Sequence, residues 1–102
     1  MNEIIENNIE AKENSFFYFL HEEGVFDESL FKTYFESVRL LDIQSAGRET
    51  IKKVIERNEY IYRSIIYHFL EGDSFVIKNL PQNIGDYIAK IDDENTRLIR
   101  ML

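Results

Sequence analysis

The chain has 102 residues, a formal net charge of −7 and no cysteine. This length predicts one domain over residues 1–102, and an apolar share of 44% with 14% aromatic residues is enough for a core. Without cysteine there is neither a disulfide framework nor a thiolate metal site. The acidic balance opposes non-specific nucleic-acid binding, so we expect no direct nucleic-acid partner.

The first predicted element is a helix over residues 2–23. Its apolar stripe comprises Ile5, Ile9, Phe16 and Leu20. Lys12 interrupts this stripe, and Gly24 is the expected C-terminal stop. The longest apolar run, residues 16–20, is far too short to cross a bilayer, so no membrane partner is expected. An acidic start without a signal-like segment, together with the missing cysteine, favours a cytoplasmic location.

The second predicted helix covers residues 27–42 and has the clearest start in the chain. Asp27 suits the N-cap, and Phe26 is placed to pack on Phe31 as a hydrophobic staple. Apolar side chains then recur at helical spacing through Leu30, Phe31, Tyr34, Phe35, Val38 and Leu41.

Two further helices are expected over residues 46–71 and 82–101. Gly72 would end the third helix, and Asp92 with Asp93 could divide the fourth into two. Asn58 and Asn95 interrupt the apolar stripes of these helices, either as satisfied polar residues or as contacts that specify a partner. Residues 74–81 are ambiguous between a strand and a loop, and we interpret them as an extended connection held by Phe75 and Ile77.

The pattern of helix, loop and helix, repeated twice, predicts an all-α fold. Short loops between successive helices favour antiparallel neighbours. We therefore expect an antiparallel four-helix bundle, or an irregular helical domain, built from two helix hairpins.

No catalytic, metal or cofactor motif is found. The only histidines are His21 and His68, and neither follows a glutamate at the three-residue spacing of a carboxylate-bridged metal site. No nucleophile elbow and no glycine-rich phosphate loop occur. The basic residues within 42–58 are interleaved with acids, which weakens a helix-turn-helix reading. We expect no enzyme activity, no cofactor and no bound metal.

Two segments nearly repeat: "SFFYFLHEEG" at 15–24 and "SIIYHFLEGD" at 64–73. Both fit the end of a helix, with apolar last turns and a glycine stop. Only the first continues into a run of acids, and residues 1–29 hold eight acidic residues against the single base Lys12. The whole surplus of negative charge therefore lies in the N-terminal quarter.

This charge map predicts a surface for a basic protein partner, because acids steer such a partner and tyrosines anchor interfaces. The expected contact residues are Tyr18, Glu22, Glu23, Asp27, Glu28, Tyr34, Tyr60 and Tyr67. The predicted function is a bacterial immunity (antitoxin-like) protein that occludes a basic toxin or nuclease domain. The alternatives are a phage-type inhibitor that mimics nucleic acid, and a structural module in which the third and fourth helices pair in a homodimer.

Overall fold

A computed structural model describes residues 2–70 and 76–102. It confirms the all-α class, and the described residues contain helices and no strands. The elements are α1 (Glu3–Ile9), α2 (Phe16–Tyr18), the π-helical turn η1 (Phe19–Glu23), α3 (Glu28–Arg39), α4 (Ile43–Ala46), α5 (Arg48–Phe69) and α6 (Ile84–Met101).

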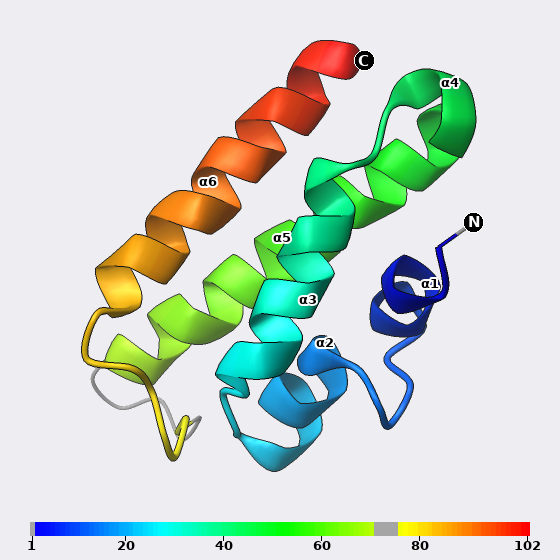
Figure 1. Cartoon of the computed structure of the whole chain (residues 1–102). Coiled ribbons are helices and arrows are strands. Elements are labelled where there is room, and N and C mark those ends of the chain that lie inside the picture. Colours follow the sequence, from blue (N-terminus) through cyan, green and yellow to red (C-terminus); the bar gives the residue numbers. More distant parts are fainter. Residues whose placement is uncertain (1, 71–75) are drawn as a thin grey trace.

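Three helices form the frame of the molecule (Figure 1). α3 and α6 run in the same direction, and α5 runs antiparallel to both and packs against α6. The N-terminal layer, which consists of α1, α2 and η1, packs on α3 and α5. Buried isoleucine, phenylalanine and leucine side chains from all these elements form one core.

The prediction of one helix over residues 2–23 is wrong, because the chain breaks after α1. Ala11 has the left-handed φ of 55°, a conformation that L-residues other than asparagine, aspartate and histidine rarely adopt. Ser15 then starts the next helix by accepting a hydrogen bond from the amide of Tyr18 (3.1 Å). The third element, η1, ends at Gly24 with φ 65°, so the predicted glycine stop is confirmed.

Asn8 holds the two pieces of this layer together. Its Nδ2 atom donates to the carbonyl of Ile4 within α1 (2.9 Å), and its Oδ1 atom accepts from the amide of Phe17 in α2 (3.0 Å). The side chain is almost fully buried. A buried amide paired on both sides fixes the angle between the two helices at little desolvation cost.

The boundaries of the other helices agree with expectation in part. Asp27 caps α3 by accepting from the amide of Leu30 (2.9 Å), as predicted. The third predicted helix corresponds to α5, which begins at Arg48; Gly47, with φ 86°, separates α5 from the short α4, which was not predicted. The aspartates at 92–93 do not interrupt α6, which is one helix. The expected stop at Gly72 and the expected anchor at Phe75 lie outside the described residues.

The connection that precedes α6 is held by polar contacts to the linker between η1 and α3. The amide of Lys78 donates to the carbonyl of Gly24 (2.8 Å). The side chain of Asn79 accepts from the amide of Phe26 (2.7 Å) and donates to its carbonyl (2.9 Å). Ile77 is buried, as predicted, and its amide donates to Nδ1 of His68 (2.9 Å).

Candidate functional site

The N-terminal layer presents its carboxylates to solvent. The exposed acids of this layer are Glu3, Glu6, Glu10, Glu13, Glu22 and Glu23. Its single base, Lys12, pairs with Glu10 at 3.2 Å. Within the described part of the chain, Glu13 and Glu23 form no ion pair. The acids that the sequence concentrates in residues 1–29 are therefore largely uncompensated on this surface.

Tyr18 lies among three of these acids. Desolvation, followed by the negative charges of Glu13, Glu23 and Glu22, raises the pKa of the Tyr18 hydroxyl above its usual value. The break before α2 brings Glu13 into this cluster, so Glu13 is a residue that the sequence analysis missed. We name Glu13, Tyr18, Glu22 and Glu23 the acidic cluster.

Asp27 and Glu28, two further residues of the predicted contact, form hydrogen bonds within the fold. Asp27 is occupied as the N-cap of α3. Glu28 accepts a hydrogen bond from the hydroxyl of Tyr87 on α6, and this bond, with desolvation as the second cause, raises the pKa of Tyr87. These two carboxylates therefore tie α3 to its own first turn and to α6.

Tyr34 has to be removed from the predicted surface, because its side chain is fully buried. Its hydroxyl donates to Oδ1 of Asn58 at 2.6 Å. Burial raises the pKa of Tyr34, with the charge of Arg57 acting in the opposite direction. Its position in the stripe with Phe31 and Phe35 was the signal for a core residue.

Tyr60 and Tyr67 lie on one exposed face of α5, with 47% and 42% of their surfaces accessible. The ring of Tyr60 contacts the edge of His21 on η1, with ring centroids 6.0 Å apart. His21 lies 3.9 Å from Glu22, and Arg63 approaches the Tyr60 ring to 5.4 Å. The structure therefore places Tyr60 next to His21, which borders Glu22 of the acidic cluster, while Tyr67 lies two turns further along α5.

Arg57 of α5 packs against the N-terminal layer next to the contact between His21 and Tyr60. Its guanidinium lies 3.8 Å from the centroid of Phe17, and its Nη2 atom donates to the carbonyl of Ile9 at the end of α1 (2.7 Å). Desolvation lowers the pKa of Arg57. A cation at a helix C-terminus complements the helix dipole. Arg57 thus fixes α1 and α2 on α5 and holds Tyr60 beside His21.

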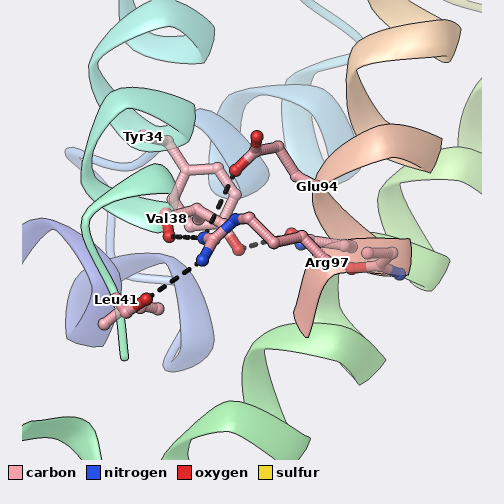
Figure 2. Close-up of polar contacts among 7 residues, drawn as sticks. Tyr34, Val38, Leu41, Glu94 and Arg97 are labelled. Carbon is pink, nitrogen blue, oxygen red and sulfur yellow. Dashed lines mark hydrogen bonds and ion pairs between the residues drawn. The ribbon is translucent and has the colours of Figure 1, made fainter. Parts of the chain in front are cut away.

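Arg97 makes the matching contact on the other side of the bundle (Figure 2). It reaches from α6 to the end of α3, where Nη2 donates to the carbonyl of Val38 (2.7 Å) and Nη1 donates to that of Leu41 (3.1 Å). Glu94 lies 3.5 Å from the same guanidinium. This contact joins α3 to α6 at one end, and the Tyr87–Glu28 bond joins them at the other.

A surface groove of about 630 Å³ lies between α3 and α6. Its aromatic lining consists of Phe31, Phe35 and Tyr87, and the ring centroids of Phe31 and Tyr87 are 4.8 Å apart. The sequence analysis missed this groove, because the two helices are far apart in the chain.

No group of three or more potential metal ligands gathers among residues 2–70 and 76–102. Within the same residues, no helix combines the length and the apolar character needed to span a membrane. Comparison with protein-family models, with curated proteins and with solved structures finds no match to this chain.

Proposed function

We propose that this protein is a non-enzymatic bacterial inhibitor of the immunity or antitoxin type, which binds a basic toxin or nuclease domain in the cytoplasm and occludes it. The observation that carries the proposal is the uncompensated acidic cluster beside the exposed Tyr60. Acidic side chains accelerate the encounter with a basic partner, and aromatic side chains contribute most once water is excluded.

Each part of this surface has a physical role in the proposal. Glu22 and Glu23 are exposed and project from η1, so they supply the field that attracts a basic surface. Tyr60 supplies an aromatic anchor that is already ordered by its contacts with Phe17 and His21. Because the side chain is held before binding, the entropy lost on association is reduced.

Capture of a partner on the tagged chain tests the proposal. We expect the wild type to retain a basic protein from native lysate, and the double variant Glu22→Lys, Glu23→Lys to lose it. The matched control is Asp92→Lys, Asp93→Lys, which changes the net charge equally at exposed positions of α6. Retention by the first variant, or equal loss by both variants, would reject the acidic cluster as the contact.

The contribution of the exposed tyrosines to binding is tested with a matched pair of variants, one at Tyr60 and one at Tyr62. Tyr60 and Tyr62 have similar exposure, 47% and 40%, but Tyr62 faces α6 and Tyr60 faces η1. Tyr60→Ser should weaken capture at least about tenfold, as removal of an interface anchor does, while Tyr62→Ser should leave it unchanged. If Tyr62→Ser weakened capture and Tyr60→Ser did not, the interface would instead lie on the face of α5 that meets α6.

A further inference from the structure

α3 and α6 are parallel and keep one register along their length. Tyr87 bonds Glu28 near the start of both helices, and Arg97 bonds the carbonyl of Val38 near the end of α3. Both pairs are separated by 59 residues in the sequence. Because the same offset holds at both ends, equivalent turns of the two helices form opposite walls of the groove.

The charges on these walls alternate along the groove. In order along α3 they are Glu28, Lys32, Glu36 and Arg39, and α6 adds Asp86 and Lys90. With the shared register, the two walls carry the same sign at the two levels where both are charged: acids at the helix starts, then a pair of lysines. Among the described residues, none of these side chains forms an ion pair.

This order of charges specifies what fits the groove. The walls carry as many acids as bases, so a partner of one sign is attracted at one level and repelled at the next. A helix that lies antiparallel to α3 must present acid, base, acid and base from its own N-terminus. α3 itself has this order.

We propose that the groove is a homodimer interface that receives α3 of a second copy in the antiparallel direction. The partner subunit's Arg39 then lies against Glu28 and Asp86, and the partner subunit's Glu36 lies between Lys32 and Lys90. Two-fold symmetry repeats every contact, as an isologous interface requires. Antiparallel helix dipoles favour the same orientation.

The floor of the groove supplies an apolar contribution as well. Phe31 and Phe35 are 4% and 1% exposed, Tyr87 is half-buried, and the accessible lining of the groove is mostly apolar. Apolar contact therefore contributes to the affinity, and the order of charges sets the direction of the partner helix. This surface uses α3 and α6, whereas the proposed contact with a basic partner uses η1 and α5, so the two proposals stand independently.

Charge reversal in two complementary variants tests the dimer. In Glu36→Lys, each new lysine faces the partner subunit's Lys32 and Lys90. In Lys32→Glu, Lys90→Glu, each unchanged Glu36 faces two new glutamates. Each variant alone should dimerise at least about tenfold more weakly than the wild type, but a mixture should pair, because lysines of one variant face glutamates of the other.

Sedimentation equilibrium supplies the readout. The wild type, with a chain mass of 12.2 kDa, should move toward twice that mass as its concentration rises. Association should weaken between about 0.1 M and about 1 M salt, where the screening length falls from about 10 Å to about 3 Å. Helical circular dichroism of each variant should match the wild type, since Lys32 and Glu36 are exposed and Lys90 is half-buried in the wall of the groove. A wild type that stays monomeric at about millimolar concentration, or a mixture of variants that does not pair, would overturn the proposal.

Discussion

Asn58 of α5 donates a hydrogen bond from Nδ2 to Oδ1 of Asn95 on α6, at 2.8 Å in the buried interior. The Oδ1 atom of Asn58 accepts from the hydroxyl of Tyr34 on α3, and Nδ2 of Asn95 donates to the carbonyl of Ile55 (3.3 Å). One chain of hydrogen bonds therefore links three helices. Of the two interpretations that the sequence left open for Asn58 and Asn95, satisfied polar residues or contacts that specify a partner, this network supports the first.

Replacement of Asn58 by leucine should lower the free energy of unfolding by about 2–4 kcal/mol, because Tyr34 and Asn95 both lose a partner inside the core. Urea denaturation followed by circular dichroism measures this loss. In a double-mutant cycle with Tyr34→Phe, the coupling should exceed about 1 kcal/mol. Additive losses would show that the two side chains do not share one network.

Arg97→Met should cost about 2–3 kcal/mol of stability, because two carbonyls at the end of α3 lose a charged donor. Arg97→Lys should recover little, since a single ammonium does not reproduce the planar fork of the guanidinium. Arg100→Met, at an exposed position of the same helix, is the control and should change stability by less than about 0.5 kcal/mol. Equal losses for Arg97→Met and Arg100→Met would contradict the capping role.

Alkaline pH should destabilise the protein through Tyr34. Its pKa is raised by burial, so the unfolded chain ionises at pH values of about 10 while the folded chain stays neutral. Stability is therefore fully present below about pH 10 and falls above it, by about 1.4 kcal/mol per pH unit for this residue. Tyr18 and Tyr87 also have raised pKa values and add to the same trend. Urea titrations from about pH 8 to about pH 11 should show a shallower decline in Tyr34→Phe, and an unchanged decline would contradict the assignment.

Two glycine substitutions should act in opposite directions. Gly24 has φ 65°, and a Cβ atom there would lie 2.7 Å from the carbonyl oxygen of Val76, so Gly24→Ala should cost more than about 1 kcal/mol. Gly85, in the first turn of α6, has open space at the same position, and Gly85→Ala should add about 0.5–1 kcal/mol. Thermal unfolding of both variants checks the pair. Destabilisation by Gly85→Ala would contradict the open environment.

The parts of the fold that depend on local signals could be predicted from the sequence. The Asp27 cap and the stop at Gly24 follow from residue types that suit those backbone conformations. α6 follows from its apolar stripe. The break after α1 could not be predicted from periodicity, because it depends on the left-handed Ala11 and on the bond from Asn8 to Phe17.

The candidate sites were less accessible to sequence reasoning, since they depend on long-range contacts. Glu28 has the pattern of a free acid at a helix start, but it meets Tyr87 from a distant helix. His21 contacts the ring of Tyr60 only because η1 packs on α5, and local sequence signals do not specify that packing. Ser15 was a readable signal of a second helix start, and with it Glu13 could have been placed near Tyr18.

The central claim is that the acidic cluster binds a basic partner. The most direct test is calorimetric titration of the captured partner with wild type, with Glu22→Lys, Glu23→Lys, and with Asp92→Lys, Asp93→Lys. The account predicts a dissociation constant at least about tenfold higher for the first variant and within about twofold of wild type for the second, because salt largely screens exposed charges that lie farther from the interface than about 8 Å. Equal affinities for all three proteins would contradict it.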